Sequence, residues 1–172
     1  GPGGALTPSD IASAYNLVGM AADGTGQTLG LFELDGYADG DIAAYESYFN
    51  LPEVPLKNVL VDGFSGLPKS GASEVTLDIE LQIALAPGAS QIIVYEGPNT
   101  DPGVLDTYNR IATDNSAQQI STSWGSSENQ SSSALLSSEN SIFQEMAAQG
   151  QSMFAASGNS GAYDDGSTLS VE

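Results

Sequence analysis

The sequence of 172 residues contains no cysteine and no histidine. Without cysteine, the chain can form neither a disulfide nor a thiolate that acts as nucleophile or metal ligand. Without histidine, it can build neither a Ser-His-Asp triad nor a His-ligated zinc site. Any acid–base chemistry in this chain must therefore use carboxylates, tyrosine or lysine.

Basic residues are also scarce. Lys57, Lys69 and Arg110 stand against 22 Asp and Glu residues, and the net charge is −19. Because binding to phosphate needs clustered Lys and Arg, this charge excludes nucleic acid and an anionic membrane surface as partners. The acidity fits plain solubility, a halophilic source or work in acid. Near pH 4 roughly half of the carboxylates would be protonated, which lowers the self-repulsion of the chain.

Long apolar runs are missing as well. No stretch reaches the ~20 apolar residues of a transmembrane helix. No signal peptide is visible either, so the sequence predicts a chain that is cytosolic or already processed.

Short apolar runs alternate with segments of helix length. Strands are expected at residues 28–34, 57–63, 91–97, 118–125 and 152–161. Helices are expected at residues 7–17, 39–50, 103–115 and 133–150, the first capped by Ser9. This alternation predicts an α/β fold with a doubly wound parallel sheet, in which ligands bind at the carboxyl ends of strands. Those ends carry Glu33, Asp35, Glu96, Trp124 and Asn159. The alternation of strands and helices stops after residue 161, as expected for one part of a larger domain.

The segment ASEVTLDIELQIALAPGAS, residues 72–90, fits two structures. Its apolar residues alternate, which favours a strand. Its place between two parallel strands requires a right-handed crossover, which favours a helix with Ser73 as a cap. We predict a helix over residues 74–85. On a helix the Cβ atoms of Glu74 and Asp78 lie about 6 Å apart and their carboxyls can touch, whereas on a strand they lie about 13 Å apart.

Glu74 and Asp78 are the first candidates for chemistry. Two adjacent carboxylates in an apolar setting can share one proton, because burial and mutual repulsion raise the pKa of one of them. A solvated helix face with two incidental acids explains the same pair. The two residues alone do not decide between these interpretations.

Three other features have a functional and a plain structural interpretation. The SGNSG turn at residues 157–161 can aim an amide or backbone N–H groups at an oxyanion, or be an ordinary turn. Trp124 is typical of a core or interface anchor. Glu33 ends an apolar strand and needs a hydrogen-bond partner there. The glycine-rich run at residues 24–30 precedes a strand instead of following one, which argues against a phosphate loop.

Together, these motifs resemble the N-terminal half of the catalytic domain of the serine-carboxyl peptidases, the sedolisins, and most of all their kumamolisin-like branch. The similarity runs over almost the whole chain, through LTPSDIASAYNL, GQTLGLFELDGY, EVTLDIELQIALAPGA, QIIVYEGP, ISTSWGSSE and FAASGNSGA. The most specific element is E-x-x-x-D in EVTLDIE. The resemblance implies a subtilisin-like fold with a mostly parallel sheet. Residues 1–172 would form the N-terminal portion of a single catalytic domain.

The resemblance also implies roles for individual residues in a Ser-Glu-Asp triad. Glu74 would be the general base and Asp78 the acid that orients it. Glu33 and Trp124 would extend the hydrogen-bond network behind Glu74. The backbone from Ser123 to Gly125 would run beside a bound peptide as an added strand. The implied activity is that of a secreted, acid-acting endopeptidase that cleaves peptides or proteins through an acyl-enzyme.

The sequence departs from the family at Asn159, where the family has the Asp of S-G-D-S-G, a protonated acid that helps to stabilise the oxyanion. An amide donates a hydrogen bond at every pH but supplies no proton. Asn159 is therefore either a working donor or an inactivating substitution. In the second case the chain would be a pseudo-peptidase that serves as a binding or structural module.

The nucleophilic serine of the family lies in an S-G-T-S motif in the C-terminal half, together with the calcium ligands, and this sequence contains neither. We expect a second polypeptide that carries the serine and the calcium site, separated by a cut near Glu172, or else an isolated or truncated fragment. A phospho-acceptor or flavodoxin-like signalling domain is a weaker third hypothesis, because no Lys stands at a strand end.

Overall fold

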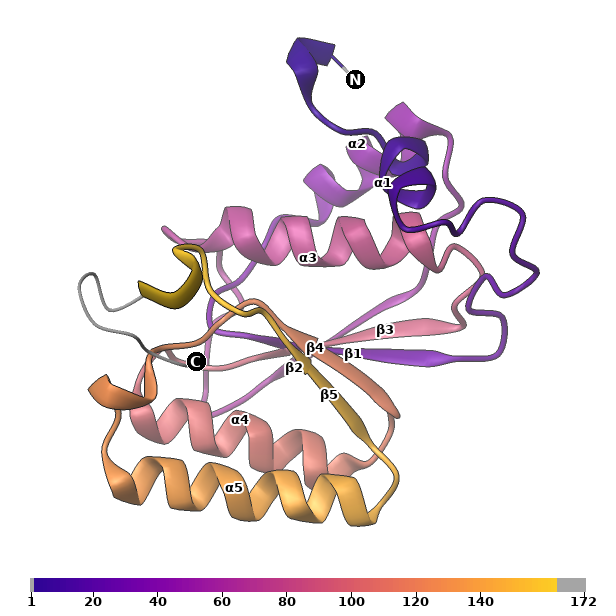
Figure 1. The fold of residues 1–172 in the computed structure, drawn as a ribbon. Helices are drawn as coiled ribbons and strands as arrows, with labels where there is room; N and C mark the ends of the chain where they lie inside the picture. Colours follow the sequence, from indigo (N-terminus) through magenta and orange to yellow (C-terminus); the bar gives the residue numbers. More distant parts are fainter. Residues whose placement is uncertain (1, 164–172) are drawn as a thin grey trace.

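The computed structural model describes residues 2–163, which fold into three layers with a parallel sheet in the middle (Figure 1). Its strands are β1 (Thr28–Glu33), β2 (Leu56–Leu60), β3 (Gln91–Glu96), β4 (Gln119–Thr122) and β5 (Ser152–Ala155). Their spatial order is β2-β3-β1-β4-β5, and all neighbours are parallel. The predicted doubly wound α/β fold is confirmed. The expected cut near Glu172 lies outside the described residues.

The helices lie on both faces of this sheet. They are α1 (Pro8–Ala14), α2 (Asp39–Phe49), α3 (Ala72–Leu85), α4 (Asp101–Asp114) and α5 (Ser133–Ala148), with short 3₁₀ helices η1 (Pro2–Gly4), η2 (Glu128–Gln130) and η3 (Gly161–Tyr163). Helices α2 and α3 cover one face, and α4 and α5 cover the other (Figure 1). In the described part of the chain, no helix is long and apolar enough to cross a membrane.

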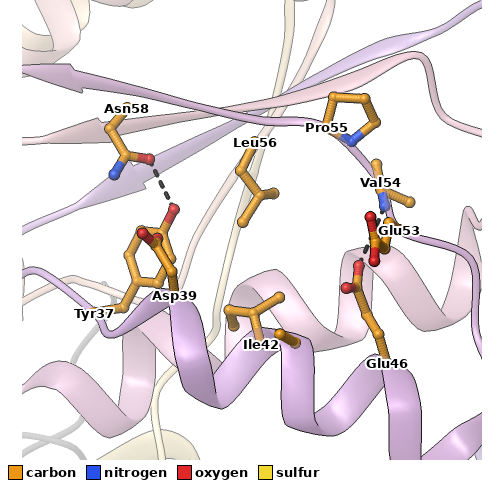
Figure 2. A pocket seen from close by; sticks show the side chains of 10 residues that line it. Tyr37, Asp39, Ile42, Glu46, Glu53, Val54, Pro55, Leu56 and Asn58 are labelled. Atoms are coloured by element: carbon orange, nitrogen blue, oxygen red, sulfur yellow. Dashed lines mark hydrogen bonds between the residues drawn. The ribbon is translucent and has the colours of Figure 1, made fainter.

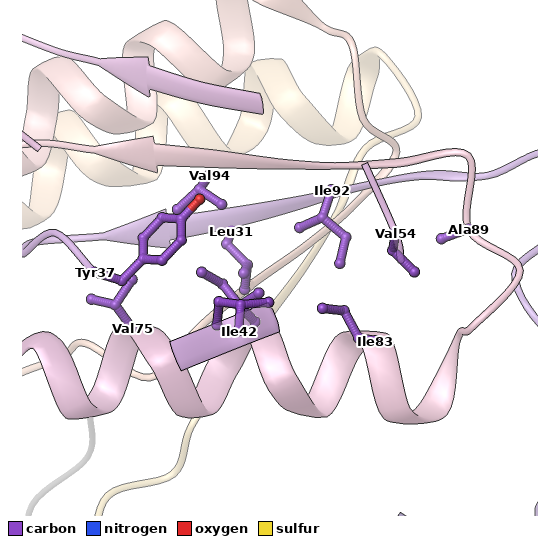
Figure 3. Packing of buried hydrophobic residues seen from close by; sticks show 10 residues of the cluster. Leu31, Tyr37, Ile42, Val54, Val75, Ile83, Ala89, Ile92 and Val94 are labelled. Atoms are coloured by element: carbon purple, nitrogen blue, oxygen red, sulfur yellow. The ribbon is translucent and has the colours of Figure 1, made fainter. Parts of the chain in front are cut away.

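The ambiguous segment is a helix, as predicted. Val75, Ile79 and Ile83 are fully buried, whereas Leu77 is 46% exposed. The buried residues repeat every four positions and face the sheet residue Leu31, as Figure 3 shows for Val75 and Ile83. Burying each of these side chains contributes about 1.5–3 kcal/mol, which favours the helix over an alternating strand.

The opposite face of the sheet carries an aromatic core. The ring of Tyr108 on α4 stacks on Phe32 of β1 at 3.9 Å between centroids and meets Phe143 of α5 edge-on at 5.0 Å. Leu31 and Phe32 are both buried although they point to opposite faces. Strands buried on both faces read as continuous apolar runs, as β1 and β3 do.

Two predicted caps are wrong. Helix α1 is capped by Thr7 and not by Ser9, because Thr7 and Asp10 form a capping box around Pro8 at the first helical position. Helix α3 is preceded by Gly71 and not by Ser73, and Gly71 makes no side-chain cap. The indole ring of Trp124 occupies the space beside Gly71. A glycine is therefore needed at this position for packing and not as a cap.

Strand β5 forms an open edge of the sheet. It pairs with β4 on one side, and among the described residues it has no strand on the other. Its residue Phe154 is 58% exposed. An apolar edge strand of this kind invites pairing or cover from another segment.

Candidate active site

A buried carboxyl group lies where β1 ends. Glu33, the last residue of the strand, is fully buried. The indole Nε1 of Trp124, just after β4, donates a hydrogen bond of 2.7 Å to Glu33 Oε2. Burial raises the pKa of Glu33 well above its usual range, and the charge of Asp78 raises it further. Glu33 therefore keeps its proton to a higher pH than a carboxyl on the surface does.

Asp78 on α3 faces the same point from the helix layer. Ser123 Oγ donates a hydrogen bond of 2.8 Å to Asp78 Oδ1. Burial raises the pKa of Asp78, the hydrogen bond from Ser123 opposes that rise, and the charge of Glu74 adds to it. A hydrogen bond between the carboxyls of Glu33 and Asp78 raises the pKa of Glu33 and lowers that of Asp78.

Two oxygens of this carboxyl pair are left without a donor. Glu33 Oε1 and Asp78 Oδ2 are buried oxygens that have no hydrogen-bond partner when both carboxyls are ionised. A single proton on Glu33, donated to Asp78, satisfies both oxygens. A proton shared in this way joins Trp124, Glu33, Asp78 and Ser123 in one chain of hydrogen bonds.

Glu74 lies one helical turn before Asp78 and is only partly buried. Its charge raises the pKa of both Asp78 and Glu33, which places it beside the hydrogen-bonded chain. A direct hydrogen bond between the carboxyls of Glu74 and Asp78 stays a prediction. Glu74 and Asp78 are thus both partly buried, whereas Glu33 is fully buried.

Sequence reasoning gave Asp35 no role, yet it holds the segment that leads into α3. Its Oδ1 accepts hydrogen bonds from the backbone N–H of Gly36 at 2.7 Å and of Lys69 at 3.0 Å. Its Oδ2 accepts one from Gly71 at 2.7 Å. Since Glu74 donates its backbone N–H to the carbonyl of Gly71, Asp35 fixes where the first turn of α3 stands. The only sequence signal for this role was the position of Asp35, an acidic residue at the end of a strand.

Gly71 carries no side chain because the indole of Trp124 occupies the space. A Cβ atom at Gly71 would lie 2.5 Å from Trp124 Cη2 and 3.1 Å from Asp35 Oδ2. No sequence pattern reveals this contact, since it joins two loops that are far apart in the chain.

Replacing Gly71 by Ala is expected to push the indole away and weaken its hydrogen bond to Glu33. We expect a loss of about 1–3 kcal/mol in the free energy of unfolding, from overpacking and a lost buried hydrogen bond. Denaturant unfolding measures it. The matched control is Gly40→Ala in α2, where a Cβ meets nothing within 4 Å. Equal stability of the two variants would contradict the packing described here.

Asn159 lies in the loop after β5 and is exposed. The preceding Gly158 has a φ of +80°, which turns the chain sharply. Figure 1 shows this loop and η3 at the same end of the sheet as the beginning of α3. Gly125, also exposed, follows β4 at that end. The sequence-predicted residues thus all lie at the carboxyl ends of the strands or on α3.

A second buried acid, Glu96, ends β3 in register with Glu33. It is fully buried, and in the described structure neither of its carboxyl oxygens has a hydrogen-bond partner. Burial raises the pKa of Glu96 from 4.5 to about 7, helped by the charges of Asp39 and Asp35. The neutral carboxyl is therefore the stable form in acid.

Replacing Glu96 by Gln is expected to flatten the dependence of stability on pH. A carboxyl whose pKa is raised on folding stabilises the fold at low pH, and this contribution is lost as the pH rises from 4.5 to about 7. The Gln variant should gain about 3 kcal/mol at pH 8 relative to the parent and change little at pH 4. Unfolding curves at both pH values measure it. An equal change at both would show that Glu96 does not titrate in this range.

A hollow of about 560 Å³ lies away from these residues, between α2 and the edge strand β2 (Figure 2). Tyr37 donates its hydroxyl to Asn58 Oδ1 at 2.8 Å, and Glu46 Oε1 accepts from the backbone N–H of Val54 at 3.2 Å. These bonds fix the connection between α2 and β2. Over residues 2–163 no three acidic side chains are grouped to hold a metal ion. The calcium site remains an expectation for a part of the protein outside this sequence.

Comparison with known proteins gives consistent results. No family model matches the chain. It is 37% identical to kumamolisin from Bacillus sp. (strain MN-32) over 167 residues, which cover 93% of this chain and 30% of kumamolisin. It is 36% identical to xanthomonalisin from Xanthomonas sp. (strain T-22) over 109 residues, 58% of this chain and 13% of that protein. Sedolisin from Pseudomonas sp. (strain 101) is 26% identical over 181 residues, 95% of this chain and 31% of sedolisin.

A solved structure shares the fold. Pseudomonas sedolisin, a serine-carboxyl proteinase complexed with pseudo-iodotyrostatin, superposes with a TM-score of 0.86 and 25% identity. The match covers 96% of this chain and 49% of the sedolisin chain. The chain therefore spans about a third of the length of kumamolisin and about half of the solved chain.

The fold is that of a subtilisin-like α/β protein, with the buried acids Glu33 and Glu96 at neighbouring strand ends. The sequence matches then identify the family. The chain belongs to the serine-carboxyl peptidases, or sedolisins, as a kumamolisin-like member of which this sequence represents a part.

Proposed function

We propose that this chain supplies the Glu and Asp of a Ser-Glu-Asp triad in an acid-acting endopeptidase. One observation carries the proposal: the hydrogen-bonded chain from Trp124 through Glu33 to Asp78, with Glu74 beside it. Family membership supplies the reaction class, which is acyl transfer through a serine ester.

In the proposed mechanism, Glu74 accepts the proton of the nucleophilic serine as that oxygen attacks the peptide carbonyl. The same proton then passes from Glu74 to the leaving amine, so that Glu74 acts first as base and then as acid. Asp78 orients Glu74, while the proton on Glu33 and the indole of Trp124 keep Asp78 in place. Burial raises the pKa of both Glu33 and Asp78, so these carboxyls keep their protons to a higher pH than surface carboxyls do, which suits an enzyme that works in acid.

The nucleophile comes from outside this sequence. We propose that a second polypeptide carries the serine together with the calcium site of the family. Its Oγ is expected about 2.6–3.2 Å from a Glu74 oxygen. The open edge of β5 with exposed Phe154 supports the proposal, because such an edge suits cover by a further part of the sheet. The assembled enzyme would act in a secreted setting.

The substrate would be a peptide or protein. Its backbone would pair with the segment from Ser123 to Gly125, and the amide of Asn159 would donate to the oxyanion. The ligand of Pseudomonas sedolisin, pseudo-iodotyrostatin, is a suitable probe for binding at this segment.

A second candidate function is favoured by Asn159 alone. If the amide cannot replace the protonated acid of the family, the protein would be a pseudo-peptidase that binds a peptide without cleaving it. The segment from Ser123 to Gly125 and the carboxyls of Glu33 and Asp78 would then help to recognise the bound peptide.

One assay separates the two functions. The full-length natural protein is incubated with an unstructured peptide library at pH values from 3 to 8, and new termini are identified by mass spectrometry. The peptidase predicts cleavage near pH 4, close to the ordinary carboxyl pKa of about 4, and its inhibition by pseudo-iodotyrostatin. Tight binding of that compound without cleavage at any pH supports the binding module and contradicts the peptidase.

A further inference from the structure

Asp35 is bonded to a part of the backbone that leads directly to the proposed base. It is 4% exposed and lies just after β1 ends. Both of its carboxyl oxygens accept backbone N–H groups, and one of these donors is Gly71 at 2.7 Å, the residue that precedes α3. A carboxylate holds such donors more firmly than a neutral acceptor does, because charge-assisted hydrogen bonds are the stronger kind.

The turn that carries Asp35 also touches the loop before α3 through its backbone. A Cβ atom at Gly36 would overlap the carbonyl oxygen of Gly66 and lie 2.9 Å from the carbonyl carbon of Leu67. Two backbones approach each other this closely only where a side chain is missing between them. The loop therefore rests on this turn near Gly66 and again at Gly71, and a displacement of the turn would displace the loop.

Gly71 passes its position on to the first turn of α3. Its carbonyl accepts the backbone N–H of Glu74 at 3.0 Å. As the residue before the helix, Gly71 offers no side chain that could cap this turn. The place of Glu74 therefore depends on the groups that hold Gly71.

Asp35 and the indole of Trp124 meet at Gly71. A Cβ atom at this glycine would lie 2.5 Å from Trp124 Cη2 and 3.3 Å from Asp35 Cβ. Trp124 belongs to the segment of residues 123–125 that is proposed to pair with the peptide. The contact at Gly71 thus relates the position of Glu74 to the position of a bound peptide.

We propose that Asp35 is a positioning residue for the reaction, which acts through Gly71 to hold Glu74 within reach of the serine proton. It touches neither the peptide nor the reacting atoms. A base must lie within hydrogen-bond distance of the proton that it accepts, and a misplacement of about 1 Å can cost about 10²-fold in rate. The proposal rests on the proposed function, because it requires Glu74 to be the base.

Asp35→Asn is the first test. The amide keeps one oxygen acceptor, but its NH₂ group would face a backbone N–H at the place of the second oxygen, so at least one of the bonds is lost. We expect kcat of the full-length protein to fall about 10–100-fold, with KM within about twofold of the parent, because Asp35 contacts no part of the peptide. Steady-state cleavage of one peptide at the pH of maximal activity measures both parameters.

Asp35→Glu separates position from charge. It keeps the charge and both acceptor oxygens, but the added methylene displaces them from Gly71. We expect kcat to fall by at least about fivefold and KM to stay unchanged. This variant also decides the question if Asp35→Asn does not fold. A folded Asp35→Glu variant with the kcat of the parent would overturn the proposal.

The control is Glu46→Ala. Glu46 is also a buried acid, 7% exposed, and it accepts the backbone N–H of Val54 at 3.2 Å in a connection away from the candidate site. Its removal should lower the midpoint of thermal unfolding and leave kcat within about twofold of the parent, at a temperature at which every variant is folded. An equal fall of kcat in Glu46→Ala and Asp35→Asn would show that lost stability lowers the rate, and would overturn the proposal.

Hydrogen exchange gives a readout that does not depend on cleavage. Peptides that cover residues 70–77 should exchange at least about tenfold faster in Asp35→Asn than in the parent, because the bond that fixes Gly71 is lost and the first turn of α3 opens more often. Exchange at these residues should be unchanged in Glu46→Ala. Unchanged exchange in Asp35→Asn would overturn the proposal whatever the activity.

The two readouts separate this proposal from the proposed function. Cleavage by the parent with an unchanged kcat in Asp35→Asn overturns the positioning role and leaves the peptidase intact. Absence of cleavage by the parent at every pH contradicts the peptidase and the positioning role together. Faster exchange in Asp35→Asn would then support only the part of the proposal in which Asp35 anchors α3.

Discussion

Replacing Glu74 by Gln is expected to lower kcat of the full protein by about 10²–10⁴-fold, the usual contribution of general acid–base catalysis. The amide keeps the shape of the side chain but neither accepts the serine proton nor returns it to the leaving group. KM should change little, because Glu74 acts on the reacting atoms and not on the peptide as a whole. Steady-state cleavage of one peptide across pH 3–7 measures both parameters.

The control for this variant is Glu80→Gln, which removes an acid from the same helix away from the candidate site. It should keep kcat within about twofold, as surface substitutions away from special features do. Thermal unfolding of both variants checks that the fold is intact. A folded Glu74→Gln variant with the kcat of the parent would exclude Glu74 as the base.

The second large effect is expected at Asn159. Replacing it by Asp should raise the maximal rate at low pH, by up to about 10²–10³-fold if the amide is a poorly placed donor, since that is the range for one oxyanion donor. The carboxylic acid donates only while it is protonated, so the gain should be confined to acid. The pH–rate profiles of both forms on one peptide measure it.

Asn159→Ala completes this comparison. If the amide of Asn159 already donates to the oxyanion, the Ala variant should lose rate at every pH. Identical profiles for Asn, Asp and Ala at this position would show that the SGNSG turn takes no part in the reaction. In that case the resemblance to the family motif would not extend to this residue.

The helix over residues 72–85 could be predicted although its apolar residues alternate. The position between two parallel strands required a crossover, and this topological requirement outweighed the periodicity. The structure shows why no conflict arises. Val75, Ile79 and Ile83 lie on the face of the helix that packs against the sheet, whereas Leu77 lies on the face exposed to solvent. The same prediction placed Glu74 and Asp78 on neighbouring turns.

Other parts of the site could not be read from the sequence because they depend on contacts between distant loops. Asp35 was visible only as an acid at a strand end, and its hydrogen bonds to the backbone before α3 arise from the fold. The close contact of Gly71 with Trp124 has no local signal at all. Glu33 and Trp124 were assigned to one network through family resemblance, and the structure gives their hydrogen bond a length of 2.7 Å.

The most direct test of the central claim is the intact mass of the full-length protein quenched in acid during turnover of an activated peptide ester near pH 4. If Glu74 is the base of a serine peptidase, a fraction of the protein should carry the mass of the acyl group on a serine outside this sequence. That adduct should be absent from the Glu74→Gln variant. Peptide cleavage without any acyl adduct, or an adduct that forms equally well in Glu74→Gln, would contradict the proposed triad.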